Sequence, residues 1–213
     1  MNIHSSVSKE IAIVGGGAIG TTTAWHLASH NHAITLIDPF LHKEANRSGN
    51  LNGTTASLGV LMGNVFRRSS GRSWRLRQRS MQLWREWLMV LNTLENPLTL
   101  ESPLVQLASS EEEASFMKKL SEERKDLGIE LLLKDIPIKC ERLWPQNIYG
   151  GLISHKDGRI DPLRLQQCLL KVLDIYNVEK IPKKVLHLEK GATTGKRQWH
   201  LHLSNGKTLT KQI

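Results

Sequence analysis

The N-terminal part of the chain places one helical pattern between two short apolar runs. Glu10–Val14 and Ala33–Ile37 are apolar and rich in β-branched residues, which is typical of buried strands. Ala18–Ser29, between them, predicts a helix, and Asp38 and Pro39 end the second run. Because a single helix connects the two strands, we expect them to be parallel and joined by a right-handed crossover, as in a βαβ unit.

A polar loop and a long amphipathic helix come next. Lys43–Gly63 is rich in Ser, Gly, Asn and Thr and carries almost no charge after Arg47, so we expect a loop that lies close against another surface. In Ser73–Leu94, apolar residues recur every three or four positions, which predicts a helix with one buried face. This face comprises Trp74, Met81, Leu83, Trp84, Trp87, Leu88, Val90, Leu91 and Leu94. We expect the tryptophans to lie in the core rather than in a cofactor site.

The middle of the chain predicts a small α+β unit. Ser110 and Glu113 have the spacing of a capping box, and a charged helix runs from there to Leu127, where Gly128 ends it. Four short strand patterns surround this helix: Leu104–Ala108, Ile129–Leu133, Ile136–Lys139 and Gly151–Ser154.

The last part of the chain predicts one helix and three consecutive strands. Asp161 and Pro162 form a helix start, and the buried face of that helix comprises Leu165, Leu169, Val172, Leu173 and Tyr176. The strand patterns are Lys183–Leu188, Gln198–Leu203 and Thr208–Ile213, the last two joined by a hairpin turn at Asn205–Gly206. The chain is therefore predicted to be α/β, with a parallel sheet and a β-meander, plus part of an α+β domain. We expect three segments: residues 1–95, 96–157 and 158–213.

Composition indicates a globular protein in a reducing compartment. Of the 213 residues, 39% are hydrophobic and 23% charged, and neither an export signal nor a membrane span is visible. Cys140 and Cys168 lack any metal-ligand spacing, so we expect a cytoplasmic protein. His200 and His202 share one face of a strand, yet no third ligand is evident, and we expect no metal.

The net charge of +9 raises the question of an anionic partner. Arginines cluster between Arg67 and Arg79 and could contact phosphates of a nucleic acid. Such runs are more often the solvated face of a helix, here one that begins near Gly71. Nucleic acid is therefore not the partner that we expect.

The strand, the glycines and the helix at the N-terminus form a dinucleotide fingerprint, Gly15-x-Gly17-x-x-Gly20. Gly15 makes the tight turn, Gly17 lets the backbone approach a pyrophosphate, and Gly20 lets helix and strand pack closely. Asp38 ends the second strand, where a carboxylate can bind the adenosine ribose. A glycine-rich turn in a generic α/β protein is the alternative.

The segment after Asp38 favours FAD over NAD. A nicotinamide-binding half would continue with a helix and a third parallel strand, whereas this chain continues with the Ser/Gly/Thr loop and the tryptophan-rich helix. That order suits a cofactor that lies extended over the loop.

The sequence resembles the FAD-dependent oxidoreductases of the D-amino-acid oxidase group, especially glycine oxidase and its relatives. The resemblance lies in Ile11–Asp38, Thr54–Leu61, Gly158–Leu165 and Val185–Glu189. It implies an FAD-binding, Rossmann-like domain of the glutathione-reductase type. It also implies that Thr54–Ser57 contacts the pyrophosphate and ribityl region, Leu58–Leu61 the isoalloxazine and the Val185 strand the adenine. The cofactor-binding residues are then Gly15, Gly17, Ala18, Ile19, Gly20, Asp38, Pro39, Thr54, Thr55, Ala56, Ser57, Leu58, Gly59 and Val185.

The resemblance also implies a reaction, hydride transfer from a small amine or amino acid to the flavin. Members of the family are longer, and the residues that hold their substrate would come after Ile213, so no catalytic residue is named. Asn31 stands where the family has glycine, an exchange that the left-handed region tolerates. The alternative is a non-catalytic FAD- or NAD-binding remnant or module of a truncated gene. The partners that we consider besides the substrate are a complementing C-terminal half and a second copy of the chain in a homo-oligomer.

Overall fold

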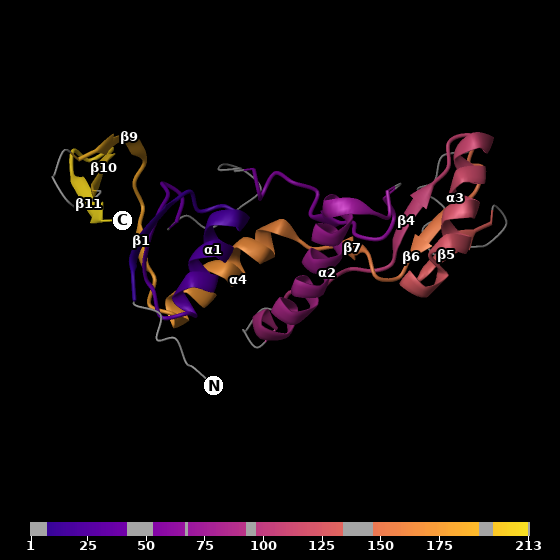
Figure 1. The fold of residues 1–213 in the computed structure, drawn as a ribbon, viewed down its shortest axis with the longest axis horizontal. Coiled ribbons are helices and arrows are strands. Elements are labelled where there is room, and N and C mark those ends of the chain that lie inside the picture. The colour runs from indigo at the N-terminus through magenta and orange to yellow at the C-terminus, as the bar shows by residue number, and fades with distance from the viewer. Residues whose placement is uncertain are drawn as a thin grey trace. The chain divides into compact units, whose positions relative to one another are not determined.

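The computed structural model describes residues 8–41, 53–66, 68–92, 97–133, 147–191 and 198–212 (Figure 1). These residues belong to two compact units. Unit 1 combines Met1–Ser57 with Pro162–Ile213, and unit 2 is Leu58–Asp161. By this division the described residues from Leu58 to Asn92 belong to unit 2. The segments 1–95, 96–157 and 158–213 stay a prediction.

A three-stranded parallel sheet forms the centre of unit 1. Its strands are β1 (Glu10–Val14), β2 (Ala33–Ile37) and β8 (Glu179–Ile181), in the order β1-β2-β8. All five residues of β1 pair in register with β2, which confirms the predicted βαβ pairing. The strand β8 has no apolar run and was not predicted. It forms because its backbone extends the ladder on the other edge of β2.

Two helices cover the parallel sheet of unit 1. Helix α1 (Ala18–Ala28) connects β1 to β2, and α4 (Pro162–Ile175) lies beside it and leads to β8 (Figure 1). Ala24 of α1 and Leu173 of α4 are fully buried, as is most of the predicted apolar face of α4. Asn31, in the turn after α1, has a φ of 63°, so this asparagine adopts the left-handed conformation that the sequence led us to expect.

A β-meander completes unit 1. It consists of β9 (Val185–Lys190), β10 (Gln198–Leu203) and β11 (Thr208–Gln212), antiparallel in the order β11-β10-β9. Gly206 has a φ of 81° in the tight turn between β10 and β11, as predicted for this hairpin. Leu201 and Leu203 of the meander pack on Ile37 of the parallel sheet. The meander therefore covers one face of that sheet.

Unit 2 contains an antiparallel sheet covered by a helix. Strands β4 (Leu104–Leu107), β6 (Gly151–Ser154) and β5 (Ile129–Leu132) lie in the order β4-β6-β5, and α3 (Glu111–Glu123) packs on β5 and β6 (Figure 1). Helix α3 continues into the short 3-10 helix η1 (Lys125–Leu127). The core of this unit comprises Val65, Ala108, Met117, Leu120, Ile129 and Leu152. The predicted strand Ile136–Lys139 lies outside the described residues.

Both ends of the α3 segment follow the predicted capping. The backbone N–H of Glu113 donates to Ser110 Oγ at 3.2 Å, and the Glu113 carboxylate accepts from the N–H and the hydroxyl of Ser109 at 2.8 Å. Gly128 ends η1 with a φ of 79°. The local sequence thus determines where this helical segment begins and ends.

The long helix of unit 2 is α2 (Gly71–Leu91). On its apolar face Met81 and Leu91 are buried, but its tryptophans are only half-buried and Val90 is exposed, so the tryptophans are less enclosed than expected. The arginines of its other face, Arg72, Arg75 and Arg79, are exposed, as in a solvated face. Two short strands, β3 (Val60–Leu61) and β7 (Gly158–Arg159), pair in the same unit and were not predicted.

Candidate functional site

The glycine turn after β1 is the first part of the candidate site. Gly15 has a φ of 108°, and its N–H donates to the carbonyl of Ile37 at 2.9 Å. This backbone conformation is one that glycine adopts without strain. A Cβ on Gly20 would lie only 1.8 Å from the Gly15 carbonyl oxygen. The fingerprint glycines therefore allow the first turn of α1 to pack directly on the turn.

Gly16, between the fingerprint glycines, was not predicted as a site residue. It is buried, and a Cβ there would lie 2.8 Å from Leu41 Cδ2 and 2.9 Å from Asp38 Cβ. Its backbone N–H donates to Asp38 Oδ2 at 2.9 Å. The run of three consecutive glycines, Gly15–Gly17, was the signal that could have identified it.

The N-terminus of α1 is suited to an anion. Gly17, the N-cap residue, makes no side-chain cap, and the first turn contains no acidic residue. Thr54 Oγ1 accepts from the N–H of Ala18 at 2.8 Å, and Ile19 is 86% exposed. The N–H groups in the first turn of a helix have no acceptor within the helix and point out of its N-terminal end. The helix dipole favours negative charge at that end. A diphosphate is the kind of group that this helix end would bind.

The carboxylate of Asp38 faces the glycine turn. Its Oδ2 accepts from Gly16, and its Oδ1 accepts from the N–H of Phe40 at 2.8 Å. The residue is half-buried, and its own N–H donates to the carbonyl of Ile181 at 3.1 Å. Each carboxylate oxygen has a second lone pair, so Asp38 retains the capacity to accept hydrogen bonds from two ribose hydroxyls.

The segment Thr54–Ser57 forms a turn beside the helix start. The N–H and the hydroxyl of Ser57 donate to the carbonyl of Thr54 at 3.1 and 2.7 Å, and Thr55 is buried. A Cβ on Gly17 would lie 3.0 Å from Thr54 Oγ1. In unit 1 the structure therefore brings together Gly15, Gly17, Ala18, Gly20, Asp38 and Thr54 from distant parts of the sequence.

The remaining predicted residues lie at other places. Pro39 is exposed next to Asp38, and Val185 packs in the small core between meander and sheet. Leu58 and Gly59 belong to unit 2, where their carbonyls accept from Arg159 Nε at 3.1 Å and from the N–H of Ile160 at 2.9 Å.

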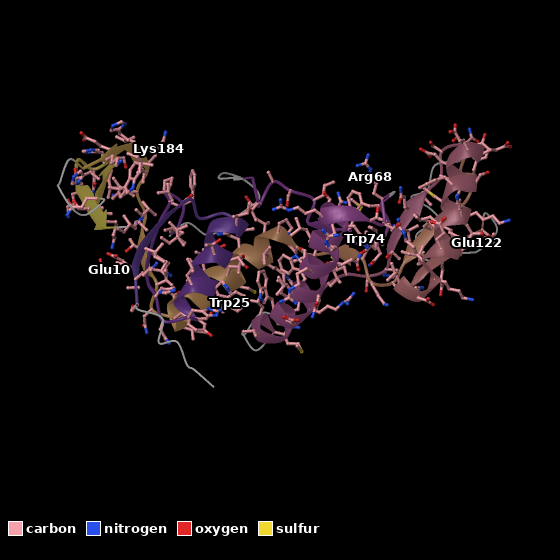
Figure 2. The ribbon with its side chains drawn as sticks, viewed as in Figure 1. Glu10, Trp25, Arg68, Trp74, Glu122 and Lys184 are labelled. Carbon is pink, nitrogen blue, oxygen red and sulfur yellow. The ribbon has the colours of Figure 1, made fainter. Side chains whose placement is uncertain are left out.

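A buried polar cluster holds the segment after β3 in unit 2. Asp157 is fully buried and accepts from the N–H of Gly63 at 2.8 Å, and from the N–H and Nδ2 of Asn64 at 3.0 and 2.9 Å. Arg124, 3% exposed, donates to the Asn64 carbonyl, and its Cζ lies 5.0 Å from the Trp74 ring centroid. Trp74 is labelled on α2 in Figure 2. Burial lowers the pKa of Arg124, and the charges of Glu123 and Asp157 oppose this shift.

The histidines of the meander make local contacts. His200 Nδ1 lies 2.9 Å from Thr210 Oγ1, and His202 Nε2 lies 3.4 Å from Glu189 Oε2. Within the described ranges, no group of three or more His, Cys, Asp or Glu is placed to hold a metal ion. Likewise, no described helix combines the length and the hydropathy of a membrane span.

Comparisons with known proteins point to one family. The sequence matches the family described as FAD dependent oxidoreductase over residues 10–212. No curated protein matches the chain. Among solved structures, glycine oxidase from Geobacillus kaustophilus is similar with a TM-score of 0.75 and 20% identity, over 96% of this chain and 54% of that one.

Two further solved structures have the same fold. Glycine oxidase from Bacillus cereus matches with a TM-score of 0.73 and 18% identity, over 96% of this chain and 53% of its own. L-alpha-glycerophosphate oxidase from Mycoplasma pneumoniae, solved with FAD bound, matches with a TM-score of 0.70 and 20% identity, over 94% and 50%. The chain thus spans about half the length of these relatives.

Proposed function

The chain belongs to the FAD dependent oxidoreductase family, and from this premise we propose that it binds FAD at the glycine turn and serves the oxidation of an amine or amino acid. Structures with a similar fold include two glycine oxidases and an iminodiacetate oxidase, which supports this substrate class. FAD, when bound, supplies a flavin ring that accepts a hydride from the substrate.

The observation that carries the proposal is the arrangement around Gly16. The open N-terminus of α1 lies on one side of the turn, and the Asp38 carboxylate, bonded to the Gly16 N–H, lies on the other. A dinucleotide has the matching groups, a diphosphate next to a ribose with two hydroxyls. Gly16 and Gly17, which lie between these two parts, carry no side chain, and a Cβ on Gly16 would lie 2.9 Å from Asp38 Cβ. The residues present therefore fit FAD.

Individual residues have distinct roles in this proposal. The N–H groups of Gly17 and Ile19 would hold the pyrophosphate, while Ala18, whose N–H donates to Thr54 Oγ1, would contribute its place in the same turn. Asp38 and the adjoining Pro39 would hold the adenosine ribose. Thr54 holds the segment Thr54–Ser57 at the start of α1, because its Oγ1 accepts from the N–H of Ala18. Thr55, Ala56, Leu58, Gly59 and Val185 stay assigned to the flavin and adenine ends of the cofactor, as the resemblance implies.

The visible spectrum of the purified chain tests FAD binding. The chain is mixed with FAD, freed of unbound cofactor by gel filtration and scanned. Flavin absorbance that co-elutes with the protein at a ratio near one supports the proposal, and a colourless protein fraction contradicts it. The same experiment is repeated with NAD, whose absorbance is followed in the ultraviolet. A protein fraction that retains FAD but no NAD excludes a general dinucleotide site.

A second candidate function is a non-catalytic FAD-binding module. It is favoured by the half-length match, because the relatives place about half of their residues outside the matched region. Hydrogen peroxide production with glycine, sarcosine and D-alanine separates the two functions. A protein that keeps FAD but produces no peroxide would be a module, whereas substrate-dependent peroxide would establish an oxidase.

The outer edge of β1 favours a polypeptide partner. Among the described strands, β1 pairs only with β2, and its three central residues, Ile11–Ile13, are apolar and only half-buried. A groove of about 1030 Å³ follows this strand. Its apolar lining comprises Ile11, Ala12, Val14, Leu188, Trp199 and Leu201, and Lys9, Glu10, Thr210 and Lys211 also line it. We propose that an apolar strand of the polypeptide that completes the family's length pairs here.

We also propose a cytoplasmic location. Cys168 is buried and does not belong to a disulfide, which fits a reducing compartment. Fluorescence of a fusion to a reporter that folds only in the cytoplasm tests this location, and its absence in an otherwise stable fusion contradicts it.

A further inference from the structure

Gln166, on the second turn of α4, reaches the glycine turn from 150 positions along the chain. Its Nε2 donates to the Gly16 carbonyl oxygen at 2.6 Å. The side chain is only 5% exposed, and it lies among the buried residues Leu165, Cys168 and Leu169. A buried amide on an apolar helix face is costly unless its hydrogen bonds are made. Packing alone therefore does not explain this residue.

The orientation of the Gln166 amide follows from its partner. Because a carbonyl oxygen only accepts, the group that faces Gly16 is the Nε2 donor. The other end of the amide, Oε1, is buried and has no hydrogen-bond partner among the described residues. Among the described residues, the hydrogen bond that the amide makes is the one to the glycine turn.

The contact sets the direction of a peptide group in the candidate site. The Gly16 carbonyl and the Gly17 N–H belong to one planar, trans peptide, in which the C=O and N–H bonds point in opposite directions. When Gln166 draws the carbonyl toward α4, the Gly17 N–H must point away from α4. The N–H of Gly16 itself donates to the carboxylate of Asp38. Gly16 is therefore fixed on both sides by side chains that are distant in sequence.

We propose that Gln166 is a positioning residue of the dinucleotide site, which aims the Gly17 N–H at the diphosphate by holding the Gly16 carbonyl. This inference rests on the proposed function for its ligand. It also ties the site to the second half of unit 1, because α4 follows the whole of unit 2 in sequence. The glycine turn is then complete only after the returning helix has packed against α1.

FAD affinity of three variants tests the proposal. Gln166→Met keeps the length of the side chain but removes the donor, and we expect it to weaken FAD binding about tenfold, the effect of one well-placed hydrogen bond. Gln167→Met is the matched control, because Gln167 is the exposed neighbour on the same helix and should bind FAD like the wild type. Equal affinity of Gln166→Met and Gln167→Met would overturn the proposal.

Gln166→Glu adds a readout that lost packing alone would not move. At neutral pH its carboxylate opposes the Gly16 carbonyl, two acceptors face each other, and binding should be weaker than in Gln166→Met. Once protonated, the carboxyl can donate to that carbonyl, so affinity should recover as the pH falls from about 8 toward about 5, with a midpoint raised by burial. Affinity that does not respond to pH, relative to the wild type, contradicts the role.

A ligand-free measurement keeps the proposal testable by itself. With ¹⁵N-glycine labelling, the Gly17 amide resonance should move in Gln166→Met and stay in place in Gln167→Met. If the wild type fails to bind FAD but the Gly17 resonance moves as expected, the proposed function fails while the positioning role stands. A Gly17 resonance that is unchanged in Gln166→Met would refute the positioning role.

Discussion

Gly20 faces the carbonyl oxygen of Gly15 so closely that a Cβ on Gly20 would lie 1.8 Å from that oxygen. The contact joins the first turn of α1 to the end of β1, and both partners are backbone, so no side-chain rotation can relieve it. The third fingerprint glycine is therefore required by the fold of unit 1 itself, whether or not a cofactor is bound.

Gly20→Ala should destabilise unit 1 by about 3 kcal/mol, the upper end of the usual cost of overpacking. Thermal unfolding followed by circular dichroism measures the loss. Gly53→Ala is the matched control, because a Cβ on Gly53 would meet no atom within 4 Å and the residue has no strained φ. If both variants unfold at the wild-type temperature, the close packing of α1 on the turn is wrong.

Asp38→Ala should weaken FAD binding by about ten- to a hundredfold, because hydrogen bonds to a charged group contribute about 1.5–3 kcal/mol. The variant removes the acceptor that we propose for the ribose and releases the Gly16 N–H. Fluorescence titration of FAD measures the affinity. Asp174→Ala serves as the control, since Asp174 lies exposed on the last turn of α4, and it should bind FAD like the wild type.

The elements of unit 1 that were predicted correctly have local signals. Ala33–Ile37 is apolar apart from Thr35, and it forms a buried parallel strand. The strand β8 escaped prediction because Glu179–Ile181 contains a single apolar residue. Its strand conformation comes from pairing with β2, which no short window of sequence reveals.

The residues of the candidate site also fall into those with a local sequence signal and one without it. Gly15, Gly17, Gly20 and Asp38 were found because their spacing along the chain reflects one βαβ unit. Gln166 was missed because its partner is 150 residues away. The tryptophans of α2 were assigned to the core from their helical spacing, but spacing gives only the side of a helix, and the extent of burial depends on what packs against it.

Asp157→Ala should destabilise unit 2 by about 3 kcal/mol or more, because it leaves buried N–H donors of Gly63 and Asn64 unpaired at about 1–3 kcal/mol each. It also removes the charge opposite the buried Arg124. Urea unfolding followed by tryptophan fluorescence reports the change, since Trp74 lies next to Arg124. The control is Asp126→Ala, an exposed acid of the same unit, and equal midpoints for the two variants would contradict the buried cluster.

Cys168 should make the stability of unit 1 fall at alkaline pH. Burial raises the pKa of its thiol above the ordinary value of 9.0. At a pH below 9.0 the Cys168 thiol is protonated in both the folded and the unfolded chain, so it adds no pH dependence to the stability. As the pH rises through 9.0, the thiol of the unfolded chain loses its proton first, and folding becomes less favourable. Unfolding midpoints between about pH 8 and 10 should fall more steeply for the wild type than for Cys168→Ala, and parallel curves would contradict the shift.

The exposed edge of β1 should cause the isolated chain to associate. An apolar strand edge with unpaired N–H and C=O groups pairs readily with another strand, and a lysine placed on it opposes such pairing. Val14 lines the groove beside β1 and is 53% exposed. We therefore expect the wild type to elute above its monomer mass of 24.1 kDa in size-exclusion chromatography without FAD, and Val14→Lys to shift toward the monomer. Ile175→Lys is the control, because Ile175 is similarly exposed, at 62%, but lies at the end of α4 and not in the groove. A monomeric wild type, or an equal shift in both variants, would show that the β1 edge is not the surface that associates.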